Sequence, residues 1–170
     1  SVLDVGASER RLESTLRASG FQGIYKSMDV DKSYRHDYYS LQEVKESFDV
    51  VTMIEVIEHV PPTVYADMLD SLRRIIRKDG KVIITTPNIF HPYAFHYGGP
   101  SHISPYPYEE MAGMALYKGF TNIRLYRACT NESRKLRMAF RLLGPFLNVY
   151  LGLDYARHML MVCTNPETKS

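Results

Sequence analysis

FDVVTMIEVIEHV, residues 48–60, is the stretch that decides the expected fold. It begins with a short apolar run rich in β-branched residues, which predicts a buried strand. It then becomes polar at Glu55, Glu58 and His59. One helical turn here would place these three side chains on a shared face. Two carboxylates and an imidazole at the carboxyl end of a central strand stand where open α/β sheets bind ligands, so the stretch also predicts a site.

Length and composition predict one globular domain. The chain has 170 residues, of which 45% are hydrophobic, and no low-complexity tract. Its formal net charge of +2 argues mildly against nucleic acid as a partner. Cys129 and Cys163 fit free thiols in a reducing compartment better than a disulfide framework. With no signal peptide and no apolar run of membrane-spanning length, we expect a cytoplasmic protein. The abrupt start on a strand raises the expectation of a missing N-terminal segment.

The beginning of the chain has the order of a βαβ nucleotide-binding unit. VLDV at residues 2–5 predicts a strand that ends in a turn at Gly6, Ser8 is suited to cap the next helix, and a second strand ends at Asp29. An acid about twenty residues past the glycine commonly binds a ribose hydroxyl, although an acid in a strand-end turn explains Asp29 equally well. Ser8 and Arg10 stand where further glycines would let the backbone approach a ligand closely, which puts that approach in doubt.

The rest of the chain predicts further helices and strands. Residues 32–47 are too few for a full strand–helix–strand, so we expect a reduced connection there. Pro62 starts a helix with an apolar stripe, and Gly80 is expected to end it. The expected elements that follow are a strand at 81–86, a helix at 109–118, a strand at 122–127 and a last strand at 158–163.

A long loop over residues 89–108 is rich in histidine and tyrosine. Loops of this length in compact domains are usually functional or disordered, and the aromatic content favours function. We expect an acceptor-side loop, in which Tyr93, Tyr97, Tyr106 and Tyr108 either line a pocket or pack the loop onto the domain.

Residues 131–153 begin basic and continue apolar. Gly144-Pro145 predicts a break between two short helices. An amphipathic insertion of this kind is suited to a membrane surface or a lipid-linked acceptor. Covering the sheet and forming a homodimer contact are the alternatives.

Together these features resemble the class I S-adenosylmethionine-dependent methyltransferases. The resemblance implies an α/β, Rossmann-like fold with a mostly parallel seven-stranded sheet, or a reduced form of it, flanking helices and an antiparallel last strand, in a single domain over residues 1–170. The motifs that carry it are VLDVG at 2–6, Asp29, FDVVTMIEVIEHV at 48–60, LRRIIRKDGKVIITTPN at 72–88 and HISPYPYEEMAGMALYKGF at 102–120.

The resemblance also implies S-adenosyl-L-methionine as the cofactor. Asp29 matches the acid that accepts hydrogen bonds from the ribose hydroxyls. The cofactor-binding residues that it implies are Asp4, Gly6, Ala7, Asp29, Val30, Asp37, Tyr38, Met53, Ile54 and Glu55.

Methyl transfer to a hydroxyl requires in-line placement of the acceptor and removal of its proton. His59 or His102 is a candidate general base, because imidazole titrates near neutral pH. Alternatively, Glu55, Glu58, His59 and His102 are candidate ligands of Mg²⁺, Mn²⁺ or Zn²⁺. The ExxEH pattern is similar to that of ubiquinone-biosynthesis O-methyltransferases and small-RNA 2′-O-methyltransferases. A third alternative is structural, with Glu58 and His59 capping or bridging the adjacent helix.

The leading functional expectation is an O-methyltransferase for a small-molecule or glycan-type acceptor. A nucleic-acid 2′-O-methyltransferase is the enzyme alternative. A non-catalytic binding module that retains the fold is the alternative suggested by the reduced glycine turn.

Overall fold

The computed structural model of the chain describes residues 1–92, 99–128 and 134–166. Within these ranges strands and helices follow one another in the order expected of an α/β domain. The strands are β1 (Val2–Val5), β2 (Tyr25–Met28), β3 (Phe48–Ile54), β4 (Ile76–Pro87), β5 (Thr121–Ala128) and β6 (His158–Thr164). The helices are α1 (Arg11–Ala18), α2 (Pro62–Ile75), α3 (Tyr108–Tyr117) and α4 (Arg134–Leu151), with a short 3₁₀ helix, η1 (Ile57–His59).

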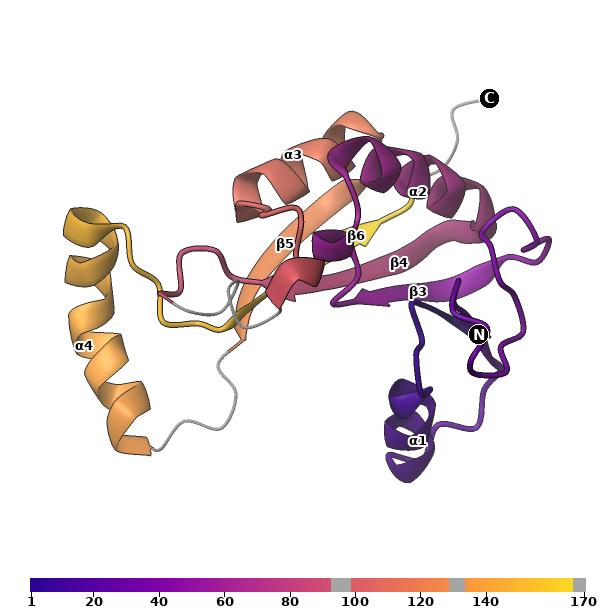
Figure 1. Cartoon of the computed structure of the whole chain (residues 1–170), viewed down its shortest axis with the longest axis horizontal. Helices are drawn as coiled ribbons and strands as arrows, with labels where there is room; N and C mark the ends of the chain where they lie inside the picture. Colours follow the sequence, from indigo (N-terminus) through magenta and orange to yellow (C-terminus); the bar gives the residue numbers. More distant parts are fainter. Residues whose placement is uncertain (93–98, 129–133, 167–170) are drawn as a thin grey trace.

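The strands form one six-stranded sheet in the order β2-β1-β3-β4-β6-β5 (Figure 1). β2, β1, β3 and β4 are parallel, and β6 lies antiparallel between β4 and β5. The expected Rossmann-like fold with an antiparallel last strand is therefore confirmed. The sheet has six strands rather than seven because the connection over residues 32–47 is reduced to an isolated bridge between Met28 and Tyr38.

Helices cover the two faces of the sheet unequally. α2 and α3 pack on one face, and α1 lies on the other beside β1 and β2 (Figure 1). Cys163 of β6 belongs to the core as a buried free thiol, whereas Cys129 lies outside the described residues. Burying each large apolar side chain contributes about 1.5–3 kcal/mol. The core between the sheet and α2 and α3 includes Leu3, Val51, Met53, Val82, Ile84, Met161, Tyr65, Leu69, Leu72, Met111 and Phe120.

The helix after the site is shorter than expected. α2 ends before Ile76, which already pairs with Phe48 of β3 and is 4% exposed. Gly80, the expected end of this helix, lies inside β4. A Cβ at Gly80 would lie 2.9 Å from the carbonyl oxygen of Arg77 and 3.0 Å from that of Asp49. The expected helix end is therefore wrong, because pairing with β3 takes the chain out of the helix first.

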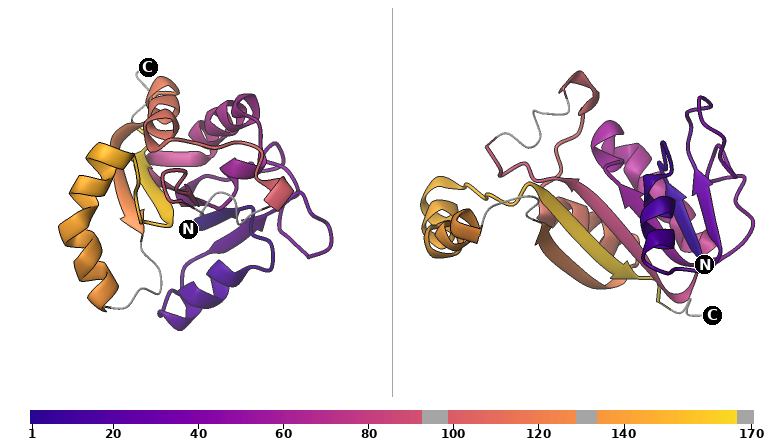
Figure 2. Two further views of the ribbon diagram at one scale, coloured as in Figure 1. Left: turned by 60° about the vertical axis from the view of Figure 1, so that its left-hand side comes forward. Right: turned by 90° about the horizontal axis from the view of Figure 1, so that it is seen from below.

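Residues 134–151 form one helix, so the expected break at Gly144-Pro145 is wrong. α4 continues through Pro145, although a proline inside a helix typically costs about 3 kcal/mol. The carbonyl group that loses its donor is that of Arg141, which is exposed and therefore accessible to water. Hydrogen bonds on both sides of the gap then suffice to continue the helix. α4 stands apart from the sheet, beyond β5 and β6 (Figures 1 and 2).

Within the described ranges, none of the helices combines the length and the apolar character that spanning a membrane would require.

For Tyr106, the structure decides between lining a pocket and packing the loop onto the domain. Tyr106 is 3% exposed and packs edge-on against Tyr65, with ring centroids 5.3 Å apart. Tyr106 therefore packs the loop onto the domain. Tyr108 opens α3, and Tyr93 and Tyr97 lie outside the described residues.

Candidate active site

The turn after β1 adopts the conformation of a glycine-rich loop, although Gly6 is its one glycine. Gly6 has a φ of +74°, and a Cβ there would lie 2.4 Å from Cγ2 of Val56. Ser8 and Arg10 also have positive φ, 42° and 58°, a conformation that costs a non-glycine residue on the order of 1–3 kcal/mol. The backbone thus takes the tight form at these positions despite the missing glycines, and close approach depends on Gly6.

Ser8 does not cap α1, so that expectation is wrong. Arg10 precedes the helix and makes no side-chain capping bond. The tight turn points the Ser8 amide at Asp29, and this amide donates to Asp29 Oδ2 at 2.8 Å. The amide of Asp31 donates to Asp29 Oδ1 at 3.0 Å. These two bonds join the end of β2 to the turn after β1 and fix the orientation of the Asp29 carboxylate.

A cavity of about 830 Å³ opens at the carboxyl ends of β1, β2 and β3. Its volume lies within the range typical of ligand pockets. Among the residues implied to bind the cofactor, Gly6, Asp29, Val30, Ile54 and Glu55 line it. Lining residues that the sequence analysis missed include Ser8, Met28, Leu41, Gln42, Val56, Val60, Asp67, Met68 and Ser71.

Other residues implied to bind the cofactor lie beneath the cavity instead of on its wall. Asp4 is buried and accepts hydrogen bonds from the hydroxyl groups of Tyr25 and Thr52, each at 2.7 Å. Burial raises the pKa of Asp4 above its usual value. Asp4 therefore links β1 to both neighbouring strands. Ala7 and Met53 are likewise buried.

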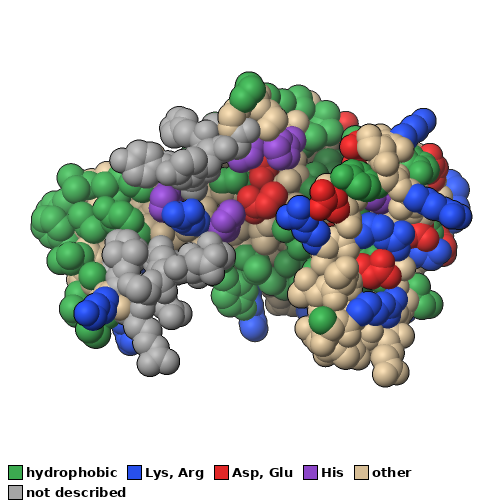
Figure 3. Space-filling model, turned by 60° about the horizontal axis from the view of Figure 1, so that its bottom comes forward, with side chains coloured by type: hydrophobic (Ala, Val, Ile, Leu, Met, Phe, Trp, Pro, Cys, Tyr) green, Lys and Arg blue, Asp and Glu red, His purple; other side chains and the backbone are tan. Residues whose placement is uncertain are grey.

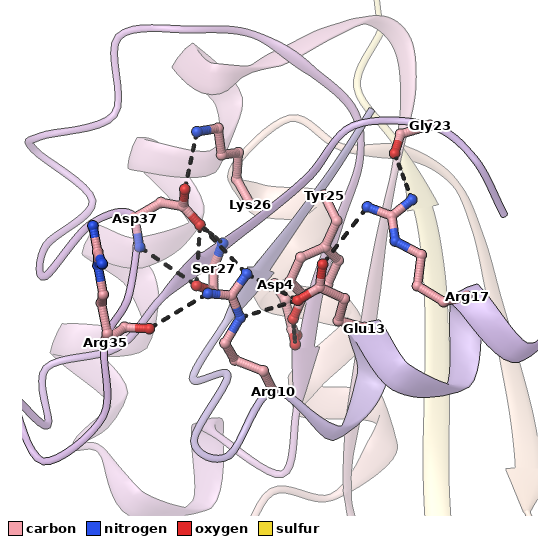
Figure 4. Close-up of polar contacts among 10 residues, drawn as sticks. All are labelled: Asp4, Arg10, Glu13, Arg17, Gly23, Tyr25, Lys26, Ser27, Arg35 and Asp37. Carbon is pink, nitrogen blue, oxygen red and sulfur yellow. Dashed lines mark hydrogen bonds and ion pairs between the residues drawn. The ribbon is translucent and has the colours of Figure 1, made fainter.

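Asp37 holds the 32–47 connection to β2 (Figure 4). Its carboxylate accepts hydrogen bonds from Lys26 Nζ and from the Ser27 amide, both at 2.9 Å, and Arg10 lies 4.0 Å away. Partial burial acts to raise the pKa of Asp37, but the hydrogen bonds from Ser27 and Lys26 outweigh it and lower the pKa. Asp37 and Tyr38, which the resemblance implies to bind the cofactor, do not line the cavity. The Tyr38 hydroxyl donates to Glu46.

Glu55 and Glu58 do not share one α-helical face, because Glu55 adopts a left-handed conformation with φ 54° and η1 begins only at Ile57. The two carboxyl groups nevertheless lie close enough for the negative charge of Glu55 to raise the pKa of Glu58. Thr85 of β4 donates to Glu55 Oε1 at 2.7 Å, and Thr86 donates to Glu58 Oε2 at 3.2 Å. The expected convergence therefore occurs through the end of β4 and not through helical spacing.

The pKa values of the two carboxyl groups are shifted in opposite directions. Burial, and secondarily the negative charge of Glu55, raise the pKa of Glu58. Burial also acts on Glu55, but hydrogen bonds from His158 and Thr85 outweigh it and lower the pKa of Glu55. The site thus separates a carboxyl group that favours its protonated form from one that favours its ionised form.

His158 is a site residue that the sequence analysis missed. Its Nδ1 lies 3.2 Å from Glu55 Oε2, and the hydrogen bond to Glu55 raises the pKa of His158. His158 is the first residue of β6, which runs antiparallel to β4. The start of such a strand lies at the same edge as the end of β4, so the expected antiparallel last strand is the signal that could have found it.

Glu58, His59 and His102 form a cluster of candidate metal ligands. One candidate ligand atom from each lies within 4.8 Å of the others. The rings of His59 and His102 meet edge to face with centroids 4.9 Å apart. The loop that carries His102 is held in place by the amides of Ile103 and Ser104, which donate to the carbonyl oxygen of Glu58. Glu55, the fourth expected metal ligand, is not part of this cluster.

Acidic and histidine side chains gather in the middle of one face of the molecule (Figure 3). Hydrophobic side chains cover the region of α4 at the left of the same view. His59 connects the two parts of the site, because it lines the cavity and belongs to the Glu58–His59–His102 cluster. The geometry therefore places a carboxyl group and two imidazoles beside a cavity of ligand-binding volume.

Comparisons with known proteins agree with this geometry. A family model described as a methyltransferase domain matches residues 1–125. The chain therefore belongs to the methyltransferase domain family. A search of curated proteins found no match.

Solved structures of methyltransferases share the fold. A SAM dependent methyltransferase from Archaeoglobus fulgidus has a TM-score of 0.75 at 15% identity, covering 96% of this chain and 85% of that chain. An S-adenosylmethionine dependent methyltransferase from Mesorhizobium loti has a TM-score of 0.66 at 11% identity, covering 96% and 89%. Phosphoethanolamine N-methyltransferase 2 from Haemonchus contortus, solved with S-adenosyl-L-methionine, has a TM-score of 0.62 at 16% identity, and this chain spans 48% of its length. Family and fold confirm the expected class I methyltransferase enzyme.

Proposed function

We propose that this methyltransferase binds S-adenosyl-L-methionine in the cavity at β1–β3 and methylates a hydroxyl group of a small-molecule or glycan-type acceptor. The observation that carries the proposal is the position of His59, at once in the cavity wall and in the Glu58–His59–His102 cluster. The acceptor oxygen attacks the methyl carbon, the carbon–sulfur bond breaks, and sulfur keeps the electron pair. The hydroxyl proton must leave during this step, so a base beside the cofactor suits the reaction.

The cofactor end of the cavity depends on Asp29 and Gly6. Backbone amides hold the Asp29 carboxylate at its wall, and each carboxylate oxygen retains capacity to accept a further hydrogen bond. Ribose hydroxyls would donate to these oxygens in charge-assisted bonds. The absence of a side chain at Gly6 keeps the turn close to Val56 and leaves the backbone open to the methionine end of the cofactor.

His59 is the better placed of the two candidate bases. Its Nδ1 lies 2.9 Å from the backbone carbonyl oxygen of Ser101. A carbonyl oxygen accepts only, so in the neutral ring Nδ1 carries the proton and Nε2 presents a lone pair. Nε2 can then take the acceptor's proton, with His102 packed against the ring.

A divalent cation is the second route to an activated hydroxyl, and one observation favours it. Glu58 Oε1 is buried with no hydrogen-bond partner among the described residues. Glu58, His59 and His102 would hold Mg²⁺, Mn²⁺ or Zn²⁺, which lowers the pKa of a coordinated hydroxyl. The raised pKa of Glu58 means that the cation must displace a proton to bind.

Titration of the full chain with S-adenosyl-L-methionine, followed by methyl-transfer assays, tests the proposal. We expect binding, and transfer to small hydroxyl compounds in preference to RNA oligonucleotides. Absence of cofactor binding would favour the non-catalytic module, and transfer to RNA alone would favour a nucleic-acid 2′-O-methyltransferase. Loss of activity in chelator with recovery in Mg²⁺ or Mn²⁺ would assign the metal route, whereas full activity in chelator would leave base catalysis by a histidine or simple proximity of the acceptor.

A further inference from the structure

α4 carries an apolar surface that no other described element covers. Seven of its large hydrophobic side chains are more than half exposed: Met138 64%, Leu142 76%, Leu143 57%, Phe146 58%, Val149 75%, Tyr150 71% and Leu151 59%. Soluble monomers rarely expose a contiguous apolar patch of this kind unless it is an interaction site. The helix stands clear of the sheet in Figure 1 and in the right view of Figure 2, and its side chains are exposed, so the described part of the domain does not bury this patch.

Four of these exposed side chains follow the helical repeat. Met138, Leu142, Phe146 and Val149 are spaced at four, four and three residues and form one continuous stripe along α4. Lys135 stands at the N-terminal end of this stripe, where a long aliphatic stem can lie along an apolar surface while its charge remains in water. The stripe is therefore suited to lie flat on a surface that is apolar inside and polar outside.

The charges of α4 indicate the sign of that surface. The helix sequence contains no Asp or Glu, and its Arg and Lys residues all fall in the first half, at 134, 135, 137 and 141. Cations near a helix N-terminus oppose the macrodipole and destabilise the isolated helix. This placement adds the positive end of the dipole to the cationic side chains, and an anionic surface would compensate both.

The position of α4 relates this surface to the acceptor side of the site. Along the chain, α4 follows β5 and precedes β6, and β6 begins with His158, which contacts Glu55. The segment between α4 and β6 is tied to the end of β4: the Asn88 side chain donates to the carbonyl oxygen of Ala156 at 2.8 Å, and the Asp154 amide donates to that of Phe90 at 2.9 Å. A surface bound by α4 would therefore lie near the end of β4, on the proposed acceptor side of the site.

We propose that α4 lies in the interface of an anionic phospholipid bilayer and presents the acceptor side of the site to a lipid-borne hydroxyl. The second part rests on the proposed function. Apolar side chains of α4 enter the boundary between headgroups and acyl chains, and the basic first half contacts lipid phosphates. The membrane then buries the apolar stripe, which no other described element covers.

Sedimentation of the full chain with phospholipid vesicles tests the membrane contact. We expect at least roughly tenfold stronger binding to vesicles of phosphatidylcholine with phosphatidylglycerol than to phosphatidylcholine alone, weakened by added salt. Leu142→Asp should reduce binding roughly tenfold or more, because an exposed apolar anchor is replaced by an anion. Leu116→Asp is the matched control: Leu116 is 63% exposed on α3, and its replacement should leave vesicle binding unchanged.

Several outcomes would overturn the proposal. These are equal binding to the two kinds of vesicle, unchanged binding of Leu142→Asp, or equal losses in Leu142→Asp and Leu116→Asp. A dimer that Leu142→Asp dissociates, without vesicle binding, would assign the stripe to a second copy of the chain. Parallel titration with S-adenosyl-L-methionine keeps the two proposals apart: cofactor binding without vesicle binding overturns only the membrane contact, and vesicle binding without cofactor binding overturns the proposed function.

Discussion

The proposed cofactor side of the site, around Gly6 and Asp29, is held together by contacts within the first βαβ unit. The proposed acceptor side, around Glu58 and His158, is assembled from distant parts of the chain. Ser8 and Asp29, which join on the cofactor side, are 21 residues apart. Glu55 and His158, which join on the acceptor side, are 103 residues apart. Amides orient the Asp29 carboxylate, while the acceptor side leaves Glu58 Oε1 buried without a partner among the described residues.

The proposed cofactor side therefore depends on contacts that are local in the sequence, whereas the proposed acceptor side depends on contacts between distant strands. A change on the cofactor side should act mainly on cofactor affinity, because the contacts there depend on β1, β2 and the turn between β1 and α1. A change on the acceptor side should act through the pairing of β3, β4 and β6, because these strands bring its carboxyl and imidazole groups together.

The largest effect is expected for Gly6→Ala, compared with Gly20→Ala. Both glycines have positive φ, +74° and +88°, but a Cβ at Gly6 meets Val56 Cγ2 at 2.4 Å and a Cβ at Gly20 meets nothing within 4 Å. Overpacking of this kind costs about 1–3 kcal/mol. Gly6→Ala should therefore weaken cofactor binding by roughly tenfold to hundredfold in calorimetric titration. Gly20→Ala shares only the backbone strain and should bind normally; equal effects in both variants would show that the close approach is unimportant.

A comparable effect is expected for Asp29→Ala, with Asp31→Ala as its control. Removing the carboxylate removes charge-assisted hydrogen bonds of about 1.5–3 kcal/mol each. Cofactor affinity should fall at least roughly tenfold. Asp31 is exposed, accepts a hydrogen bond from the Ser33 amide and does not line the cavity, so its replacement should leave affinity unchanged. Unchanged affinity in Asp29→Ala would remove this carboxylate from the cofactor site.

The smallest effect is expected for the pH dependence of stability in His158→Gln. The pKa of His158 is raised by Glu55, so the imidazolium contributes stability below about pH 6.5, the unfolded pKa, and loses this contribution as pH rises through the folded pKa. The loss of unfolding free energy in His158→Gln should be larger at about pH 6 than at about pH 9, and below about 1 kcal/mol because the pair is partly exposed. Denaturant unfolding at the two pH values measures it.

A Glu55→Gln background provides the control for this pair. The amide cannot supply the negative charge that raises the pKa of His158, so His158→Gln should then cost the same at both pH values. A pH dependence that persists without Glu55 would show that the long-range contact is not its source.

Patterns within short segments predicted the local elements around the proposed cofactor site. The buried strand that ends at Ile54, the turn at Gly6 and the acid at Asp29 all occur where the sequence indicates them. The roles of Ser8 and Asp37 were not predictable in this way. The Ser8 amide bonds to Asp29 across two elements, and the side chain of Asp37 bonds back to β2. Contacts between segments decide such roles, because residue type alone does not reveal which partner comes close.

Residue order and type alone establish the methyltransferase family motifs, the alternation of strands and helices, and the set of acids and histidines available for chemistry. Strand pairing selects among that set: it joins Glu55 to His158, leaves Glu58 with His59 and His102, and ends α2 at the start of β4. The physical reason is that hydrophobic periodicity acts over a few residues, whereas a sheet joins residues a hundred positions apart. Residues 48–60 thus encode the strand and the acids, and the packing of β4 and β6 around them determines what each acid contacts.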